Sequence, residues 1–552
     1  MERKTPLRHV TLGQLLDEAI EFHGENDAVV YADRDYRLTY REFGKTVDNL
    51  AKGLMALGIK KGEKVGIWAT NVPYWVALQF ATAKIGAILL TVNTLYKREE
   101  LSYILKQSEA ENLFLIDGYQ DCDYVQTVYD LIPELRTCER GYLSSETFPH
   151  LKRLFFLGVE KHRGMYSIPE IMSLSAMISD DEYKARQESL SPDDVVNMQY
   201  TSGTTGFPKG VMLTHYNIGN NGFWIGENQL LRHNDRVCLP VPLFHCFGCV
   251  LGVIACVTHA STMVFVEFFN ALTVMASIEQ EKCTAVYGVP TMYIAMLEHK
   301  MFNKFDFSSL RTGIMSGSLC PISLMRKVMD LMHMKEITIP YGLTEASPVI
   351  SQTTTDDTIE RKVGTVGKIM PEIEVMIVDP ETGLPVPPGV HGEICCRGYS
   401  VMKGYYKMPE ATAETIDENG WLHSGDLGVM DNEGYLKITG RIKEMIIRGG
   451  ENIYPKEIEE FILQVDKIAS VQVVGVPSKK YGEEVGTFII LKKGEDFTEE
   501  DVKDFCRGKI SRFKVPKYIA FVDSFPLTAS GKVQKYKLVE LAAKIWPEAM
   551  QE

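Results

Sequence analysis

Residues 200–210, Tyr-Thr-Ser-Gly-Thr-Thr-Gly-Phe-Pro-Lys-Gly, combine glycines, small hydroxyl residues and a lysine in a single short stretch. The apolar run before them, residues 195–200, predicts a short buried strand. A glycine-rich turn after a strand exposes backbone N–H groups that can surround a polyphosphate. The spacing differs from that of a Walker A loop. A flexible linker is the alternative, and the preceding strand disfavours it. The residues expected to contact phosphate are Thr201, Ser202, Gly203, Thr204, Thr205 and Lys209.

A second polar segment, Tyr341-Gly-Leu-Thr-Glu345, follows an apolar stretch that predicts a strand over residues 337–340. Side chains beyond the carboxyl end of such a strand face a ligand crevice in an open α/β sheet. Tyr341 could stack on a purine and Thr344 could bond a phosphate oxygen. Glu345 is the type of ligand that Mg²⁺ prefers beside phosphate oxygens. Taken alone, the segment is explained more simply as a capped helix start.

Several single residues carry weaker chemical signals. Gly317 follows a predicted strand, where glycine lets the backbone approach a ligand. Asp426 follows a glycine, which usually indicates a plain turn. Lys532 lies near the C-terminus, where a lysine is normally solvated. His245 and Trp224 lie in apolar stretches, so core packing is the simpler interpretation of both.

The elements that must position these residues alternate between strand and helix. Residues 64–69 predict a strand, residues 74–84 a helix and residues 87–92 another strand. This alternation is typical of doubly wound α/β sheets. It continues beyond the glycine-rich segment with short strands predicted at residues 236–243, 284–288, 311–315 and 337–340.

The sequence pattern changes in the last third of the chain. Residues 364–440 contain short strands with Gly/Pro turns, which predict a small β-barrel. A charged stretch and a compact mixed pattern follow. We therefore predict an α/β protein with a large N-terminal domain, residues 1–440, made of doubly wound sheets and the small barrel. A small α+β C-terminal domain, residues 441–552, follows it.

Composition limits the possible classes of protein. A chain of 552 residues predicts two or more domains, and a net charge of −14 argues against nucleic-acid binding. No signal peptide is visible, and residues 246–266, the most apolar stretch, predict buried strand and helix instead of a membrane span. The eleven cysteines show no disulfide or zinc spacing. We expect a cytoplasmic protein, with peripheral membrane association left open.

Residues 200–210 resemble, over all eleven positions, the phosphate loop of the acyl-adenylate-forming superfamily of acyl-CoA synthetases, peptide-synthetase adenylation domains and firefly luciferases. The resemblance extends over nearly the whole chain and looks closest to bacterial medium- and long-chain fatty acyl-CoA synthetases. Ser424 stands where the family has Thr, and Glu444 often where it has Asp. Further segments resemble family motifs in the family's order: residues 316–319, 341–345, 421–426, 440–459 and 526–532.

The resemblance implies roles in binding ATP and Mg²⁺. Tyr341 would pack on adenine, Glu345 would ligate Mg²⁺ beside Thr344, and Asp426 and Arg441 would hold the ribose. The turn that lines the adenine and carboxylate pockets would contain Gly317 and Ser318, with Gly342 in the adenine motif.

It also implies residues for catalysis and for the other substrates. Lys532 would be the mobile catalytic lysine, and Lys443 would be the pivot about which the small domain rotates. Gly449 and Gly450 would line the route of the coenzyme A thiol. The carboxylic acid would lie near His245, Trp224, Gly288 and Gly317.

The activity implied is that of an ATP-dependent acyl-CoA synthetase, with acyl-AMP as intermediate. The pocket segments contain no Lys or Arg, which favours a hydrophobic acid such as a medium- or long-chain fatty acid. Aromatic or alicyclic acids are the alternative, as are loading of a carrier protein, release of acyl-AMP, a luciferase-like reaction or a nucleotide sensor. A homodimer is compatible with the sequence. The pocket segments are residues 221–227, 244–251, 287–293 and 316–320.

Overall fold

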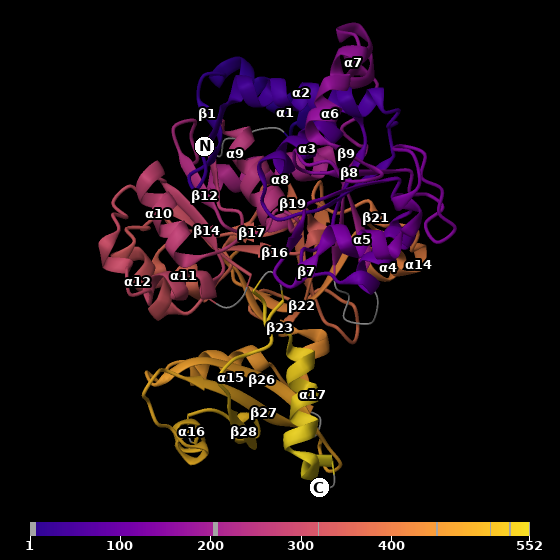
Figure 1. Ribbon diagram of the computed structural model, residues 1–552. Coiled ribbons are helices and arrows are strands. Elements are labelled where there is room, and N and C mark those ends of the chain that lie inside the picture. Colours follow the sequence, from indigo (N-terminus) through magenta and orange to yellow (C-terminus); the bar gives the residue numbers. More distant parts are fainter. Residues whose placement is uncertain are drawn as a thin grey trace.

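The structure is a computed structural model, and it describes residues 7–201, 208–317, 320–448, 451–507, 509–528 and 531–550. Figure 1 shows a large domain that contains the N-terminus and a small domain that contains the C-terminus. Both combine helices with sheets, which confirms the predicted fold class. No helix in these ranges is long and apolar enough to cross a membrane.

Two sheets form the centre of the large domain, and most of their strand pairs are parallel. The eight-stranded sheet consists, in spatial order, of β21 (Gly404–Tyr405), β11 (Lys209–Thr214), β10 (Val195–Thr201), β4 (Ile88–Thr91), β3 (Lys64–Trp68), β5 (Asn112–Leu115), β8 (Arg153–Phe156) and β9 (Met165–Ser167). The six-stranded sheet consists of β15 (Thr312–Met315), β14 (Ala285–Gly288), β12 (Arg236–Leu239), β13 (Thr262–Phe265), β1 (Asp27–Tyr31) and β2 (Tyr36–Thr39). The strands predicted at residues 64–69, 87–92, 236–243, 284–288 and 311–315 all appear here.

Helix α3 (Pro73–Ile85) is buried along its length and contacts α1 (Leu12–His23) and α2 (Tyr40–Ala56). It carries a single basic residue, Lys84, whose Nζ lies 2.6 Å from Asp17 in α1 and 2.8 Å from Asp48 in α2. A buried ammonium needs such partners. The lysine therefore joins three helices through one charge cluster.

Helix α8 (His215–Asn228) packs against η3 (Phe247–Ile254) and α9 (Ala255–Thr258). All eight residues of η3 are buried, and η3 is a π-helix, a rare form that is frequent at functional sites. Strand and helix were predicted for residues 246–266, and η3, α9 and β13 occupy this range. The remaining helices of the large domain are α4 (Arg98–Ser108), α5 (Tyr124–Leu131), α6 (Ile168–Ser173), α7 (Asp180–Glu188), α10 (Ala271–Glu281), α11 (Pro290–Leu297), α12 (Ile322–Leu331), α13 (Ile359–Gly364) and α14 (Pro409–Thr415).

The described part of the large domain also contains a two-stranded sheet, β6 (Gly118–Tyr119) with β7 (Cys122–Asp123). Two further small sheets are connected by the pairing of Lys368 with Tyr435. The predicted strand over residues 337–340 is wrong, because only Thr338 pairs with β15 and the strand begins at Pro340. One sheet contains β16 (Pro340–Gly342), β17 (Val349–Gln352) and β18 (Lys368–Ile369). The other contains β19 (Ile373–Val378), β20 (Gly392–Gly398), β22 (Leu422–Met430) and β23 (Leu436–Arg441).

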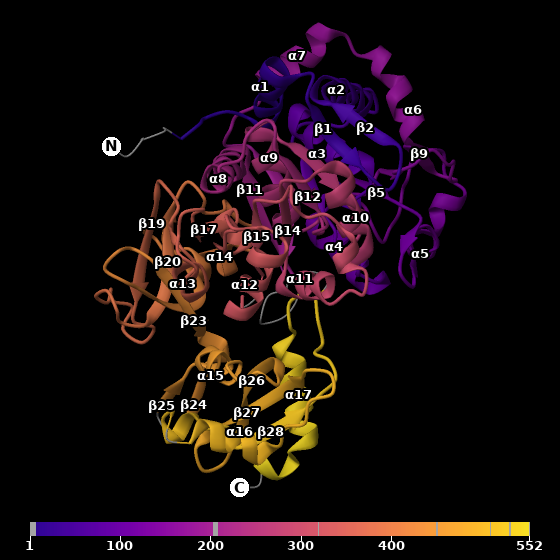
Figure 2. The same ribbon diagram turned by 90° about the vertical axis from the view of Figure 1, so that its left-hand side faces the viewer.

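The small domain packs helices against a five-stranded sheet. Figure 2 shows the chain before its last long helix rising from this domain toward α11 of the large domain. The strands are β24 (Ile446–Arg448), β25 (Glu451–Ile453), β26 (Ile468–Ser478), β27 (Gly482–Leu491) and β28 (Tyr518–Phe521). The helices are α15 (Pro455–Ile462), α16 (Glu499–Cys506) and α17 (Lys535–Ile545).

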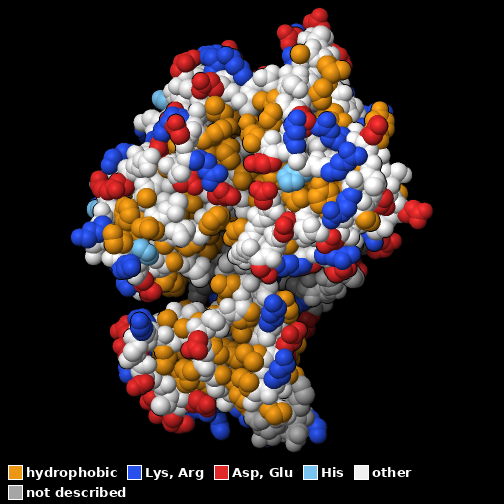
Figure 3. Space-filling model, viewed as in Figure 1, with side chains coloured by type: hydrophobic (Ala, Val, Ile, Leu, Met, Phe, Trp, Pro, Cys, Tyr) orange, Lys and Arg blue, Asp and Glu red, His pale blue; other side chains and the backbone are white. Residues whose placement is uncertain are grey.

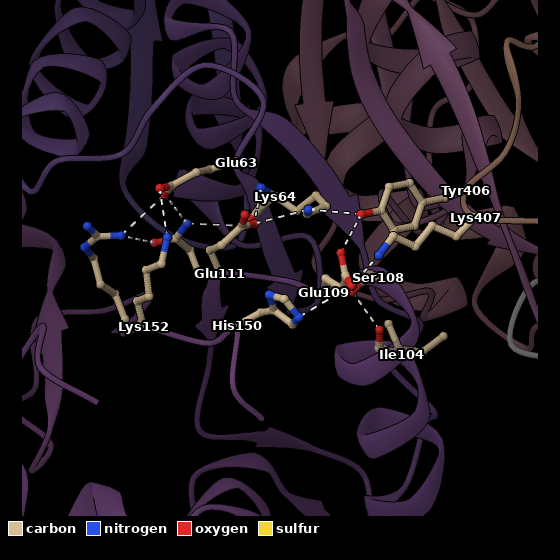
Figure 4. Close-up of polar contacts among 12 residues, drawn as sticks. Glu63, Lys64, Ile104, Ser108, Glu109, Glu111, His150, Lys152, Tyr406 and Lys407 are labelled. Carbon is tan, nitrogen blue, oxygen red and sulfur yellow. Dashed lines mark hydrogen bonds and ion pairs between the residues drawn. The ribbon is translucent and has the colours of Figure 1, made fainter. Parts of the chain in front are cut away.

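Figure 4 shows a row of polar contacts that joins the eight-stranded sheet to Tyr406 and Lys407, the two residues after β21. Tyr406 OH donates to Glu109 Oε2 at 3.0 Å and accepts from Lys64 Nζ at 3.4 Å. Lys407 pairs with the same glutamate. The backbone N–H of Tyr406 donates to the carbonyl of Gly210 at 2.8 Å. The polar row therefore supports the first residues of β11.

We predict that Tyr406→Phe lowers the stability of the large domain. The ring remains, but both hydrogen bonds of the hydroxyl are lost, and bonds to charged groups contribute about 1.5–3 kcal/mol each when buried and less when partly exposed. Calorimetric melting should show a lower midpoint for this variant. Tyr142→Phe is the control, since Tyr142 is 79% exposed. Equal melting temperatures for the two variants would contradict the prediction.

Candidate active site

The glycine-rich segment joins two antiparallel strands. Thr201 is the last residue of β10, Lys209 is the first of β11, and the two are paired across the sheet. The ammonium of Lys209 lies 4.2 Å from the centre of the Tyr405 ring. The intervening residues Ser202, Gly203, Thr204 and Thr205 lie outside the described residues.

Glu345 lies beside this hairpin, in the short 3₁₀-helix η5 (Thr344–Ala346). Its Oε1 accepts hydrogen bonds from Tyr405 OH at 2.8 Å and from Thr201 Oγ1 at 3.5 Å. Burial and the neighbouring glutamate raise the pKa of Tyr405. The carboxylate and hydroxyls form a corner made of oxygen atoms, which suits a hard cation such as Mg²⁺.

Asp426 is the centre of a second cluster. Tyr341 OH donates to its Oδ2 at 2.9 Å, and Arg441 Nε lies 2.9 Å from its Oδ1. Burial, and then the charge of Asp426, raises the pKa of Tyr341, while Asp426 is the largest cause that raises the pKa of Arg441. Three residues predicted from separate motifs are thus in direct contact. Adenine packing by Tyr341 stays a prediction.

Lys532 comes from the small domain and reaches both clusters. Its pKa is lowered, chiefly by burial, with Arg441 lowering it further and Cys246, Asp426 and Glu345 raising it. A Cβ placed on Gly317 would lie 3.8 Å from Lys532 Cε. The backbone N–H of Thr528 donates to the Lys532 carbonyl at 2.7 Å, which closes the loop that carries the lysine. The charges of both the glutamate and the aspartate clusters therefore act on this ammonium.

His245 lies next to this lysine at the start of the π-helix segment. Its Nδ1 accepts a hydrogen bond from the backbone N–H of Phe247 at 3.1 Å. Desolvation and the charge of Lys532 lower the pKa of His245 to about 3. A neutral imidazole with an occupied Nδ1 can donate from Nε2 to a carboxylate.

An apolar wall continues from His245. Trp224, Phe247 and Met292 retain 8–9% exposure, whereas Tyr287 behind them is fully buried. A Cβ on Gly288 would lie 3.2 Å from the Tyr293 ring, so a side chain there would crowd the wall. Trp224, Phe247, Tyr287 and Met292 belong to one apolar cluster.

The remaining predicted residues have more limited evidence. Thr344 Oγ1 lies 3.7 Å from Cys246 Sγ, at the foot of the glutamate corner. Gly342 packs against the backbone, since a Cβ there would lie 1.8 Å from the carbonyl oxygen of Pro348. Lys443 lies in η6 (Ile442–Glu444), directly after β23. Ser318, Gly449 and Gly450 lie outside the described residues.

Sequence reasoning missed Tyr405 and Cys246. Tyr405 contacts both Glu345 and Lys209, yet it follows a glycine in the segment that was interpreted only as barrel. Cys246 is buried beside Thr344 and His245. Tyr405 belongs to no motif with a spacing signal, and Cys246 belongs only to the lone C-x-x-C of Cys246-Phe-Gly-Cys249, which does not indicate this site.

We predict that Tyr341→Phe weakens nucleotide binding by roughly five- to tenfold, because it leaves Asp426 held by Arg441 alone and one hydrogen bond is worth about 1 kcal/mol. Isothermal titration with ATP measures the change. Tyr435→Phe is a matched control, since it removes a tyrosine–carboxylate bond, to Asp357, outside this cluster. Unchanged affinity in Tyr341→Phe would show that this bond does not orient Asp426.

Comparisons with known proteins agree with this arrangement. Residues 16–406 match the family described as AMP-binding enzyme, and residues 457–532 match its C-terminal domain. The chain is 53% identical over 534 residues to YngI of Bacillus subtilis, whose name as an acyl-CoA synthetase is provisional, with 97% of each chain covered. It is 42% identical over 544 residues to the mitochondrial medium-chain acyl-CoA ligase ACSF2 of Danio rerio, covering 98% of this chain and 89% of that protein.

Among solved structures, ATP-bound MatB from Rhodopseudomonas palustris matches with a TM-score of 0.82 at 25% identity, covering 97% of this chain and 100% of that chain. The family matches span most of both domains, and the relatives align over nearly the full chain. The chain therefore belongs to the AMP-binding enzyme family, and it is an AMP-forming acid–thiol ligase.

Proposed function

We propose that this enzyme is an acyl-CoA synthetase that activates a hydrophobic carboxylic acid, a medium- or long-chain fatty acid, with ATP and transfers the acyl group to coenzyme A. The observation that carries the proposal is the joining of Tyr341, Asp426 and Arg441 in one cluster, with Lys532 of the small domain near Gly317. A cation supplied there by a separate domain suits a reaction in which negative charge gathers at a phosphate.

In the first step, the substrate carboxylate attacks the α-phosphorus of ATP and pyrophosphate leaves. The carboxylate is itself the nucleophile, so no general base is required, and the neutral His245 serves to orient it. Lys532 stabilises the charge that the carboxylate and α-phosphate share in the transition state. Lys209 and Thr201 neighbour the departing pyrophosphate, with Ser202–Thr205 completing the loop as the sequence predicts.

Mg²⁺ fits the oxygen corner built from Glu345, Thr201 and Tyr405. When bound there with ATP, the ion would neutralise phosphate charge. Thr344 lies beside this corner, and its Oγ1 contacts Cys246 Sγ. The ribose hydroxyls would be held by Asp426, which Tyr341 and Arg441 orient.

In the second step, the coenzyme A thiol attacks the acyl carbonyl, the acyl–phosphate bond breaks and AMP leaves. The volume that Lys532 fills must first be vacated, because it lies at the reacting carboxylate. We infer that the small domain, residues 441–552, rotates about Lys443, which lies between β23 and β24. Gly449 and Gly450 would then line the route of the thiol.

The apolar residues predicted to surround the acyl group support a hydrophobic substrate. They include Trp224, Phe247 and Met292, and the stretches around them contain no Lys or Arg that would pair with a second carboxylate. The medium-chain name of the Danio rerio relative points the same way. These observations favour an aliphatic chain as the acyl group, and aromatic or alicyclic acids stay the alternative.

The experiment that tests the function measures AMP and pyrophosphate with a panel of acids, with and without coenzyme A. The panel contains straight-chain acids of increasing length, benzoate and cyclohexanecarboxylate. AMP and acyl-CoA should appear in equal amounts with straight-chain acids. Pyrophosphate formation that ignores coenzyme A would overturn the proposed acceptor and indicate a carrier protein or free acyl-AMP. Turnover of benzoate alone would overturn the acyl class.

We predict that Lys532→Ala lowers the adenylation rate by roughly 10²–10³-fold, as expected for loss of a charge that stabilises the transition state. Conversion of supplied acyl-AMP to acyl-CoA should be preserved, because the lysine leaves before that step. Lys537→Ala is the control, since Lys537 is exposed on α17. Equal losses in both half-reactions would show that Lys532→Ala damages the fold instead.

The lowered pKa of Lys532 predicts a pH dependence with a defined sign. The ammonium is the active form, so kcat/KM for ATP, which reports the free enzyme, should fall as pH rises through the lowered pKa. The fall should begin below the ordinary lysine range. Lys532→Arg should remove this alkaline decline, since arginine stays charged. A decline that persists unchanged in Lys532→Arg would assign it to another group.

A further inference from the structure

Three side chains that the mechanism does not use converge on one face of the sheet that carries Asp426. Cys395 of β20 pairs directly with His423 of β22, and Glu393 lies two positions before Cys395 on the same strand. Alternate residues of a strand share a face, so the sheet itself brings carboxylate, thiol and imidazole together.

The same place contains the bulge that presents Asp426. Between the pairs Cys395–His423 and Glu393–Leu427, β20 advances two residues while β22 advances four, which pushes out Ser424, Gly425 and Asp426. Glu393 Oε1 accepts the backbone N–H of Gly425 at 2.9 Å and so fixes the bulge. One carboxylate oxygen of Glu393 therefore contacts the bulge, and the other contacts His423.

The separations between the three groups are close to those of a zinc shell. His423 Nδ1 lies 2.9 Å from Glu393 Oε2 and 3.4 Å from Cys395 Sγ, and the ligand atoms all lie within 4.8 Å of one another. Tetrahedral Zn²⁺ with bonds of about 2.0–2.3 Å places its ligands about 3.3–3.5 Å apart. Small side-chain movements would open the centre enough for an ion.

Burial and chemistry further define the ion. Cys395 is fully buried, whereas the His423 side chain is 34% exposed and gives access from solvent. Burial, and then the charge of Glu393, raises the pKa of the Cys395 thiol, so a metal must displace its proton. Thiolate with imidazole selects borderline-soft cations and disfavours Mg²⁺. The magnesium that ATP needs would not compete for this site.

We propose that Glu393, Cys395 and His423 form a binding site for Zn²⁺ or a similar divalent cation, and that its occupancy opposes ATP binding. A carboxylate drawn to the ion loosens its hydrogen bond to Gly425, and the bulge that aims Asp426 at the ribose then shifts. By linkage, ATP weakens zinc binding by the same factor. The opposition to ATP rests on the proposed function, whereas the metal site itself does not.

Metal binding is tested on the full chain without turnover. The protein is stripped with a chelator and titrated with Zn²⁺ against a chromophoric chelator in excess Mg²⁺, and with Co²⁺ followed by absorption. One site with a thiolate-to-cobalt charge-transfer band is expected. Cys395→Ser should abolish the band and weaken zinc binding on the order of 100-fold. Cys395→Ala provides a second variant, and Cys138→Ser is the control, since Cys138 is a free, partly exposed thiol outside the cluster.

The opposition to ATP is tested by adenylation at fixed free Zn²⁺. The KM for ATP should rise with zinc in the wild type and in Cys138→Ser, and stay constant in Cys395→Ser, whose activity without zinc should equal that of the wild type. Equal zinc affinity in wild type and Cys395→Ser would overturn the site. A cobalt band with an unchanged KM for ATP would overturn the opposition. Failure of the proposed function would instead remove adenylation from every variant and leave the cobalt band intact.

Discussion

The arrangement of the two domains depends on one buried ammonium. Lys532 leaves water to lie near two carboxylates, Glu345 and Asp426, and near the guanidinium of Arg441. Desolvation outweighs the attraction, which is why the pKa of the lysine falls. A polyphosphate would add several negative charges at the same place, and the attraction would then outweigh the cost of desolvation. Under the proposed function, bound ATP would therefore supply much of the attraction between Lys532 and the site.

Asp426 connects these charged groups to the segment that joins the two domains. It lies on a bulge of β22, and its partner Arg441 is the last residue of β23, directly before η6 and Lys443. A ribose bound at Asp426 would thus be linked through a single residue, Arg441, to the segment that connects the domains. If the small domain rotates about Lys443 as proposed, Arg441 precedes the pivot as the last residue of β23 and can keep this contact while Lys532 moves away.

The parts of the site that could be predicted from the sequence are those that lie in motifs resembling the family's. Tyr341, Asp426, Arg441 and Lys532 each lie in a distinct motif, and the structure brings them together. The strand–helix alternation likewise gave β3, β4, β12, β14 and β15 of the two large sheets.

What it did not predict depends on contacts between distant segments. Tyr405 enters the site through pairing of β21 with β11. Within residues 337–340, Thr338 pairs with β15 whereas Pro340 already pairs with β17, so the segment does not form one strand. The two-residue mismatch between β20 and β22 that presents Asp426 is also a property of pairing. No count along one strand reveals it.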